Sequence, residues 1–341
     1  MNLYKVKILS LLENKYIGVP IIMLLDCLFT ILNKYPILYS DSSTYLSSGF
    51  ELETPFDRPI VYGILLRIFS LNGISLLLVP ICQALIFTYV LYQVLTLFFS
   101  GSRIFLRLLL FSFLQTFTCG FNWSINQLLP DLFSAIGFLS LICLLFKDSK
   151  PRSECPLFLL FFISTSSHIS NLLIYTVVFV LILIGRRKFL PDLNMRFFKI
   201  KSFILVFLIL LSYLIMMSAI SKSKDVFYAG SLSQKGILQT ILKEKCPEHH
   251  FRLCSFKDSI PESFAYFVWN PRSPLYILGG WKENREELKK INALTFTSSR
   301  YFILQLKASF SFFLKQLIML DICEGNGCFD ESTVLIKRIQ K

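Results

Sequence analysis

The residues best suited to chemistry lie in one polar segment, residues 34–59, between two apolar stretches of this 341-residue chain. A carboxylate in such a segment can take the proton from an attacking hydroxyl group. An arginine can hold a phosphate through two parallel hydrogen bonds while negative charge develops on it. We predict Asp41 as the base and Arg58 as the phosphate contact. The segment supplies three more acids that we predict to contact substrate: Glu51, Glu53 and Asp57.

Two later connections supply further residues of the predicted substrate-binding site, namely Asn126, Asp131 and His168. The last two also have simpler explanations. Asp131 follows Pro130 at the expected start of an apolar helix, where the helix dipole favours a negative charge. His168 lies among hydroxyl side chains, as an interfacial histidine with no chemical role would. The acids of residues 34–59 would equally suit a solvated loop, so both explanations stay open.

The composition indicates a membrane protein. Hydrophobic residues make up 54% of the chain and charged residues only 17%, which leaves too little polar surface for a soluble domain of this length. Uncharged runs such as Asn171–Gly185 and Phe203–Ile220 end beside Lys or Arg. Only α-helices and closed β-barrels satisfy all their backbone hydrogen bonds inside a bilayer, and these runs are long enough to form helices that cross it. We therefore predict an all-α polytopic membrane protein.

The net charge of +13 indicates membrane orientation rather than nucleic-acid binding. Most basic residues lie at the ends of apolar segments, where the positive-inside rule assigns them to the cytoplasm. No helix carries a long basic stripe, and no nucleic-acid motif is present, so no nucleic-acid partner is predicted. The sequence therefore predicts a cytoplasmic N-terminus, an outer location for residues 34–59, and cytoplasmic connections at 100–107, 147–154 and 186–201.

The apolar stretches predict the order of the helices. The first is an uncleaved anchor that carries Asp26, an ionisable residue expected to face a bundle interior or a polar cavity. The second span has Pro80 near its start, where we expect a kink. The predicted spans are Ile17–Asn33, Ile74–Phe99, Leu108–Gly120, Leu132–Phe146 and Phe203–Ile220, with Ile60–Leu71 as an interfacial helix and Pro156–Gly185 as a hairpin whose tip lies outside.

The C-terminal part of the chain is more polar. Lys307, Ser311 and Lys315 recur at four-residue spacing, which places them on one face of a helix. Such a face suits a helix lying on the membrane, and equally a span whose polar face contacts the bundle. The predicted domains are a transmembrane bundle over residues 1–220, an extracytoplasmic lobe over 221–300, and an amphipathic or membrane helix with a polar tail over 301–341.

Nine cysteines are scattered through the chain, and two of them form a local pair in the lobe. Cys246 and Cys254 are expected to form a disulfide if the lobe faces an oxidising compartment. Zinc binding together with His249 and His250 is the alternative, although Cys-x2-His-His-x3-Cys is not a common zinc spacing. No cofactor is predicted, and a requirement for a divalent metal stays open.

Signatures of nucleotide binding and of soluble hydrolases are missing, including the Walker loop, G-x-G-x-x-G, H-E-x-x-H and G-x-S-x-G. Three short segments resemble the GT-C superfamily of membrane glycosyltransferases. Asp41-Ser-Ser-Thr-Tyr45 is similar to its acid-bearing first outer loop. Arg58-Pro-Ile-Val-Tyr-Gly63 resembles the Arg-Pro-x-x-Tyr segment that opens its interfacial helix, and Leu129-Pro-Asp-Leu-Phe133 looks like the start of a later helix.

This resemblance implies a GT-C-like helical bundle in a bacterial inner membrane. It further implies a polyprenyl-phosphate-linked sugar as donor, a glycan or lipid as acceptor, and a base in the first outer loop, which Asp41 matches. The chain departs from the superfamily in two ways: Asp41 stands apart from Glu51 and Glu53, and there are fewer spans. The lobe segment from Leu253 through Trp269-Asn-Pro-Arg-Ser-Pro274 to Gly280 resembles a family of uncharacterised bacterial multi-pass proteins.

Two other classes of function stay open beside the transferase. One is a non-catalytic assembly factor or scaffold of a surface-polysaccharide system, and the other is a transporter of lipid-linked glycans. Transporters usually carry internal repeats and broken helices at mid-membrane, which this sequence lacks apart from Pro80. The sugar, the acceptor and the oligomeric state are not predicted. An enzyme requires Asp41, Arg58, Asp131 and His168 in one place.

Overall fold

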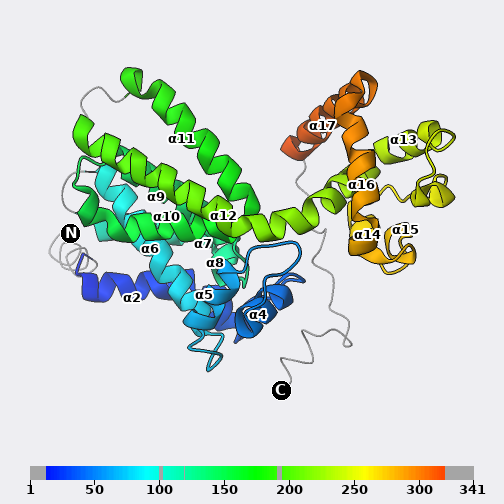
Figure 1. Cartoon of the computed structure of the whole chain (residues 1–341). Coiled ribbons are helices and arrows are strands. Elements are labelled where there is room, and N and C mark those ends of the chain that lie inside the picture. Colours follow the sequence, from blue (N-terminus) through cyan, green and yellow to red (C-terminus); the bar gives the residue numbers. More distant parts are fainter. Residues whose placement is uncertain (1–12, 100–102, 119, 190–193, 319–341) are drawn as a thin grey trace. The chain divides into compact units, whose positions relative to one another are not determined.

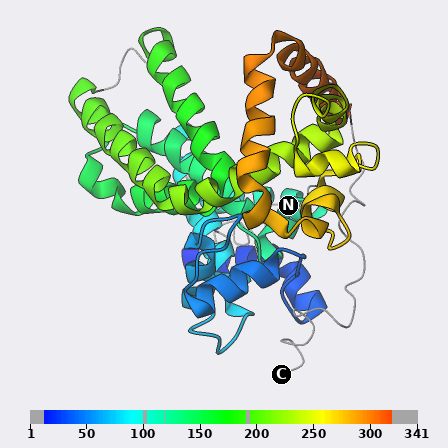
Figure 2. The same cartoon turned by 45° about the vertical axis from the view of Figure 1, so that its right-hand side comes forward.

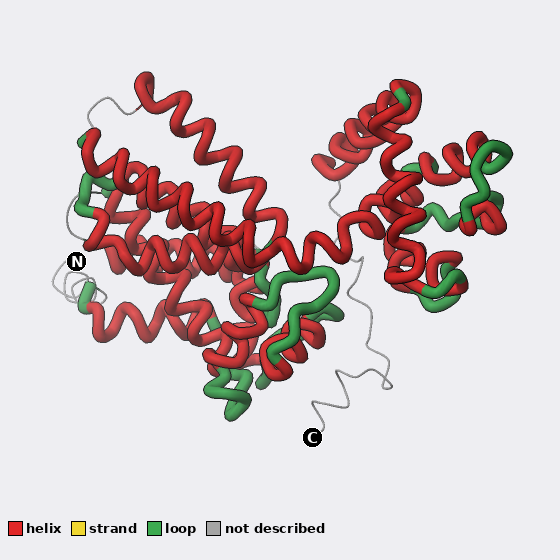
Figure 3. The backbone as a smooth tube through the Cα atoms, in the orientation of Figure 1, coloured by secondary structure: helices red, strands yellow, loops and turns green. Residues whose placement is uncertain are grey.

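The computed structural model describes residues 13–99, 103–118, 120–189 and 194–318, and over these residues it is all-helical. Figure 3 shows helices joined by loops, with no strand in this part of the chain. The prediction of an all-α protein is therefore confirmed. The chain divides into two compact units, with the boundary between Ala219 and Ile220. Helix α12, Met195–Gln234, runs without a break across this boundary.

Unit 1 is a helical bundle in which α9 packs against α6, α10 and α11, while α2 packs against α7 (Figure 1). Leu132, Ile136 and Leu144 lie four or eight residues apart on α9 and are fully buried, so they form its core-facing stripe. The long helices are α2 (Lys15–Asp26), α6 (Leu78–Phe98), α7 (Ile104–Thr118), α9 (Asp131–Phe146), α10 (Cys155–Ser167), α11 (Ile169–Phe189) and the first part of α12.

The connections of unit 1 collect at two ends of the bundle. At one end, Lys201 of α12 donates to the carbonyl oxygen of Lys147 at 2.8 Å, and Lys147 Nζ donates to Gln93 Oε1 at 3.0 Å. At the other end, Ile37 and Gln127 form an isolated parallel bridge. Successive long helices therefore run in alternate directions between the two ends.

The first predicted span is two helices rather than one. α2 ends at Asp26, and the next helix, α3, is Leu28–Asn33. The Asn126 side chain fills the break: its Nδ2 donates to the carbonyl oxygen of Asp26 at 2.7 Å, and its Oδ1 accepts from the Thr30 N–H at 3.0 Å. The Asp26 carboxylate is fully buried and accepts from Gln115 Nε2 at 2.9 Å. Asp26 thus faces the bundle interior, where α7 supplies a hydrogen bond to its carboxylate.

The polar segment 34–59 contains a helix that the sequence does not predict, α4 (Ser42–Glu51). It packs against α5 (Val61–Phe69), and the two lie side by side, in shades of blue, in Figures 1 and 2. Each helix has a glycine at the contact: a Cβ atom added to Gly49 would lie 2.0 Å from the carbonyl oxygen of Gly63. Only glycine allows the two backbones to approach so closely.

Two sequence predictions concerned interruptions of helices. Pro80 lies in the first turn of α6, where its missing N–H has no partner to lose, so the predicted kink is wrong. The chain turns at His168, between α10 and α11, and these helices form a hairpin. Phe161 and Tyr175 lie seven residues before and after His168, and their ring centroids are 5.5 Å apart.

Two described helices are long and apolar enough to cross a membrane: Leu78–Phe98 and Met195–Met217. The second is the more informative, because only 22% of its most apolar window is buried inside the structure. Phe203 and Leu214, for example, are exposed on α12. A helix at the core of a soluble protein would instead bury such side chains. The other apolar helices, α7, α9 and the part of α11 up to Gly185, are shorter.

Unit 2 is a helical lobe that includes the second part of α12 and the last described helix. Trp269 and Trp281 have ring centroids 4.9 Å apart, and Trp281 Nε1 donates to the carbonyl oxygen of Val268 at 3.0 Å. Cys246 and Cys254 form a disulfide. The helices are α13 (Ile237–Lys245), η2 (Arg252–Phe256), α14 (Phe264–Trp269), α15 (Pro274–Ile277), α16 (Gly280–Thr297) and α17 (Ser299–Ile318).

Candidate functional site

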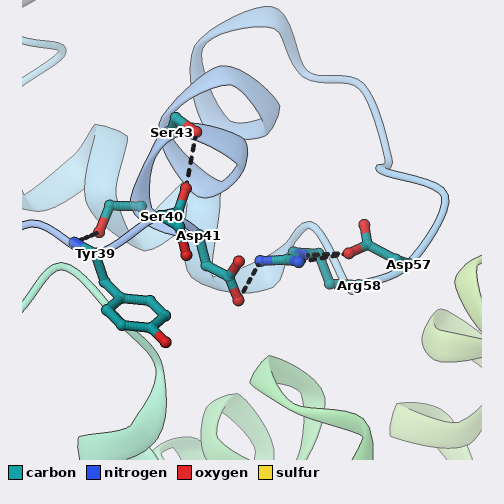
Figure 4. A network of polar contacts seen from close by, with 7 residues as sticks. Tyr39, Ser40, Asp41, Ser43, Asp57 and Arg58 are labelled. Atoms are coloured by element: carbon teal, nitrogen blue, oxygen red, sulfur yellow. Dashed lines mark hydrogen bonds and ion pairs between the residues drawn. The ribbon is translucent and has the colours of Figure 1, made fainter. Parts of the chain in front are cut away.

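Arg58 lies between two carboxylates in unit 1 (Figure 4). Its Nη1 is 2.9 Å from Asp41 Oδ2, and its Nε donates to Asp57 Oδ2 at 2.8 Å. The side chains of Arg58 and Asp57 are 13% and 10% exposed, whereas that of Asp41 is 47% exposed. Arg58 Nη1 is buried and has no hydrogen-bond partner beyond the ion pair. One carboxylate therefore fixes the guanidinium from inside, and the other is open to a reactant.

The start of α4 leaves the Asp41 carboxylate available. Asp41 occupies the N-cap position, where an aspartate usually accepts a hydrogen bond from an N–H group of the first turn. Its side chain makes no such bond here, although its carbonyl oxygen accepts from the Tyr45 N–H at 3.2 Å. The neighbouring Ser42 Oγ instead accepts from the Tyr39 N–H at 2.9 Å. The Asp41 carboxylate is thus directed to Arg58 rather than to its own helix.

The Arg58 guanidinium lies on a column of aromatic rings. Its Cζ is 5.1 Å from the ring centroid of Tyr45, a cation–π distance. The Tyr45 and Tyr62 rings meet edge to face at 5.2 Å, and those of Tyr62 and Phe133 at 5.9 Å. The Tyr62 hydroxyl donates to Gln83 Oε1 at 2.9 Å. The column joins α4, α5, α6 and α9, so the position of Arg58 is set by four helices.

Arg58 keeps its positive charge near neutral pH. Burial alone would lower the pKa of Arg58, but the hydrogen bond and charge of Asp57, together with the charge of Asp41, raise it above the ordinary value. Burial raises the pKa of the Tyr45 hydroxyl above its ordinary value, so this ring stays neutral. Arg58 consequently stays positively charged between its two carboxylate partners.

A short backbone pairing brings Asp131 toward Asp41. Ile37 and Gln127 pair in parallel, and each is followed four residues later by an aspartate, Asp41 in one segment and Asp131 in the other. Burial of the carboxyl, and to a smaller extent the charge of Asp41, raise the pKa of Asp131. The residue as a whole is exposed, so solvent screens this effect.

His168 joins this group from the tip of the α10–α11 hairpin. Its Nδ1 lies 2.7 Å from Ser170 Oγ. Its charge acts on Asp131, where it opposes the larger effect of burial and lowers the pKa of that carboxyl. His168 is half-buried, and Asp131 is the first residue of α9. The hairpin tip and the start of α9 therefore belong to the same electrostatic neighbourhood.

The structure brings Asp41, Asp57, Arg58, Asp131 and His168 into this neighbourhood, but three other predicted residues lie elsewhere. Glu51, at the far end of α4, is exposed and accepts from Ser47 Oγ at 2.7 Å. Glu53 is exposed in the loop that follows. Asn126 is fully buried at the α2–α3 break. These three residues do not enter the site that we propose below.

The aromatic support of the site was not predicted from the sequence. Tyr45 follows Asp41 by four residues, and Tyr62 follows Arg58 by four. Residues four apart lie on one face of a helix. The four-residue spacing could have indicated that these tyrosines lie beside Asp41 and Arg58, because α4 begins directly after Asp41 and α5 begins three residues after Arg58.

The site residues do not form a metal centre of a familiar kind. Over the described residues, no group of three or more His, Cys, Asp or Glu side chains converges as metal ligands would. Asp57 is bound to Arg58 and thereby has a cationic partner of its own. The alternative zinc site in the lobe is excluded in this structure, because the sulfur atoms of Cys246 and Cys254 are bonded to each other.

Comparison of the chain with models of protein families, with curated proteins and with solved structures finds no match. Its function must therefore be argued from its own residues and their geometry.

Proposed function

We propose that this protein is a polytopic membrane glycosyltransferase with a GT-C-like bundle, and that it takes its sugar from a polyprenyl phosphate. The observation that carries the proposal is the Arg58 guanidinium, which holds a lasting charge 2.9 Å from the exposed carboxylate of Asp41. A base beside a phosphate-binding cation is the pair that sugar transfer from a lipid phosphate requires. The acceptor is a hydroxyl group of a glycan or a lipid.

The proposed reaction uses these residues in one displacement. The Asp41 carboxylate takes the proton of the acceptor hydroxyl, and the acceptor oxygen attacks the anomeric carbon of the donor sugar. The bond from that carbon to the phosphate oxygen breaks, and the lipid phosphate leaves with the bonding electrons. The Arg58 guanidinium, whose Nη1 is paired only with Asp41, offsets the negative charge that develops on the leaving phosphate. Asp57 holds the guanidinium through Nε, while Asp131 and His168 contact the sugar.

Exposed apolar surface on the bundle helices supports the membrane location. Large exposed apolar patches are rare on soluble monomers, and on this chain they cover successive turns of the same helices. A bilayer would cover such surfaces without a protein partner. The exposed side chains include Leu110, Phe113 and Phe117 on α7, Leu173, Val177 and Leu181 on α11, and Phe203, Phe207 and Leu214 on α12.

The charges at the two ends of unit 1 support an outer location for the site. Acids predominate at the end of unit 1 that carries Asp41 and Asp131, whereas basic residues predominate at the other end. The positive-inside rule assigns the basic end to the cytoplasm. The described basic residues there include Lys15, Arg103, Arg107, Lys147, Lys150 and Arg152. We therefore propose a bacterial inner-membrane protein with a cytoplasmic N-terminus and an outward-facing site.

Unit 2 supports the same orientation by an independent feature. The disulfide between Cys246 and Cys254 suits an oxidising compartment outside the cytoplasm. In α17, Phe302, Leu306 and Phe310 are exposed, and Lys307 lies among them. We propose that α17 lies along the outer membrane–water interface, with its apolar side chains in the bilayer.

An Asp41→Asn variant tests this function in a cell whose surface glycans can be profiled. The substitution keeps the shape of the side chain but removes the base, so we expect loss of one glycan product at an unchanged protein level. Glu53→Gln is the matched control, since it removes an exposed acid of the same segment that lies outside the site. An unchanged glycan profile with Asp41→Asn would reject Asp41 as the base.

One observation favours the non-catalytic alternative, a scaffold of a polysaccharide system. The ion pairs of Arg58 with Asp41 and Asp57 join the start of α4 to the residues before α5, as a purely structural clamp would. If the ion pairs are only a clamp, Asp41→Asn lowers the free energy of unfolding. Sugar transfer in the cell is then unchanged, because other proteins carry it out. The transferase predicts the reverse: lost transfer with a stability change below about 1 kcal/mol, since one partner is largely exposed.

A further inference from the structure

A groove in unit 1 uses residues that the proposed transfer site does not. It lies between α2, α3 and α6 and has a volume of about 720 Å³, within the range of about 300–1,000 Å³ for ligand pockets. Its walls are mainly apolar and include Met23, Leu24, Ile31 and Ile81. Leu24, Ile31 and Ile81 are themselves exposed, so the groove is open along one side.

Two side chains in the lining carry a nitrogen or oxygen atom that can form hydrogen bonds, Thr30 and Lys34. They lie together at one end of the groove. Thr30 is in α3, and Lys34 is the C-cap of the same helix, four residues later. Residues at this spacing share a helix face. The apolar lining continues from them along α2 as far as Pro20. The groove therefore has an apolar length and a polar, positively charged end.

Both polar residues have unused capacity to bind an anion. The Thr30 side chain is buried, with the residue 5% exposed, and its Oγ1 has no hydrogen-bond partner. Its backbone N–H is already bonded to Asn126, so only the hydroxyl is free. Lys34 is exposed and forms no ion pair with any acid among the described residues. A buried hydroxyl without a partner is unfavourable, and a bound ligand oxygen would satisfy it.

We propose that this groove binds an anionic glycerophospholipid, with one acyl chain along α2 and the headgroup phosphate between Thr30 and Lys34. The apolar length matches an acyl chain, and the ammonium and hydroxyl match a phosphate in charge and in hydrogen bonding. The helix of a second copy would cover the apolar wall but leave both polar groups unmatched. The site requires that unit 1 lies in a membrane, but it does not depend on the sugar-transfer chemistry.

The test is native mass spectrometry of the full chain, purified in detergent and supplied with phosphatidylglycerol or phosphatidylcholine. We expect one retained phosphatidylglycerol per chain, at about fivefold higher occupancy than phosphatidylcholine, because one basic residue near an anionic headgroup has an effect of this size. Lys34→Gln should abolish this preference, and Lys34→Arg should retain it. Lys15→Gln is the matched control, since it removes the same charge at the opposite end of α2.

A second variant separates the chain-binding wall from the headgroup end. Ile81→Trp places a larger side chain in the groove and should lower the occupancy of both lipids, while circular dichroism checks that the helices remain. Equal retention of the two lipids by the unsubstituted protein would overturn the proposal. So would an unchanged preference in Lys34→Gln, a lipid-free dimer, or displacement of phosphatidylglycerol by a polyprenyl phosphate at equal concentration. Lipid retention is read without any transfer assay, so its failure is distinct from failure of the proposed function.

Discussion

Unit 1 contains two ion-pair clusters that are built from similar residues and differ in exposure. In the first, Lys201 Nζ lies 2.7 Å from Glu154 Oε2, and the two side chains are 1% and 3% exposed. In the second, Arg58 pairs with Asp41, whose side chain is 47% exposed. The first cluster is closed to solvent and to ligands. The second leaves the Asp41 carboxylate within reach of a reactant, beside the Arg58 guanidinium.

The two clusters differ in the exposure of the paired carboxylate. Lys201 also donates to the carbonyl oxygen of Lys147, and the Ser149 hydroxyl donates to Glu154. Glu154 Oε2 and Arg58 Nη1 are both buried, and each has only its ion pair. Ion pairs in helical bundles can thus hold helices together or bind ligands, and the exposure of the paired carboxylate decides which.

The largest expected effect is on the closed cluster. Lys201→Met leaves the Glu154 carboxylate buried without its charged partner, and we expect a loss of about 3–5 kcal/mol in the free energy of unfolding. Denaturant unfolding in detergent micelles measures it. The double variant Lys201→Met with Glu154→Leu removes both charges and should recover most of the loss. A loss below about 1 kcal/mol in the single variant would mean that the cluster is hydrated.

The open cluster should respond in activity rather than in stability. Arg58→Lys keeps the positive charge but loses the planar group that reaches two partners. We expect sugar transfer to fall about 100-fold, the effect of losing one donor to a developing negative charge. The stability change should be smaller than that of Lys201→Met, because Arg58→Lys keeps a positive charge beside the buried Asp57. Equal transfer by Arg58→Lys and the unsubstituted protein would remove Arg58 from the proposed chemistry.

The contact that positions the open cluster can be tested separately. Gly49→Ala would place a Cβ 2.0 Å from the carbonyl oxygen of Gly63, so α4 and α5 must move apart. We expect a loss of about 1–3 kcal/mol in thermal unfolding experiments, together with reduced transfer. Gly120→Ala is the control, since a Cβ there has no atom within 4 Å and should change stability by less than about 0.5 kcal/mol.

The smallest expected effect concerns the pH dependence of stability. Because the pKa of Asp131 is raised in the folded protein, the folded state holds its proton to higher pH than the unfolded state. The stability that this proton confers is present below the ordinary value of 3.8 and is lost as the pH rises through the folded pKa. Asp131→Asn removes this dependence.

Thermal unfolding of both proteins across the acidic range measures the Asp131 contribution. The stability of the unsubstituted protein relative to Asp131→Asn should decline with rising pH. Its total change should remain below about 1 kcal/mol because the residue is exposed and solvent screens its charge. A difference that rises with pH would show that Asp131 is stabilised in its charged form.

Some features of the fold could be predicted because they depend on local sequence. The helical class follows from the apolar runs, and the turn at His168 follows from the hydroxyl-rich stretch between basic ends. Two of the helix-level errors had non-local causes. The break after Asp26 is filled by an amide 100 residues away in Asn126. The formation of α4 depends on its glycine contact with α5.

The same distinction applies to the site. Because successive helices run in opposite directions, the connections that carry Asp41, Arg58, Asp131 and His168 lie at the same end of the bundle. This alternation can be predicted from the basic residues in the other connections. The direction in which a single side chain points cannot. Asn126 is polar and lies in the expected connection, yet it is buried because a helix break needs its amide. Glu51 belongs to the same segment as Asp41, but α4 places it at its opposite end.

The central claim is that the exposed Asp41 carboxylate acts as a base beside Arg58, and one measurement tests it most directly. The full chain and its Asp41→Asn variant would be reconstituted in vesicles with a panel of polyprenyl-phosphate-linked sugars, and the release of polyprenyl phosphate would be followed. The account predicts acceptor-dependent release by the unsubstituted protein and a loss of at least about 100-fold in the variant. Equal release by the two proteins would contradict it.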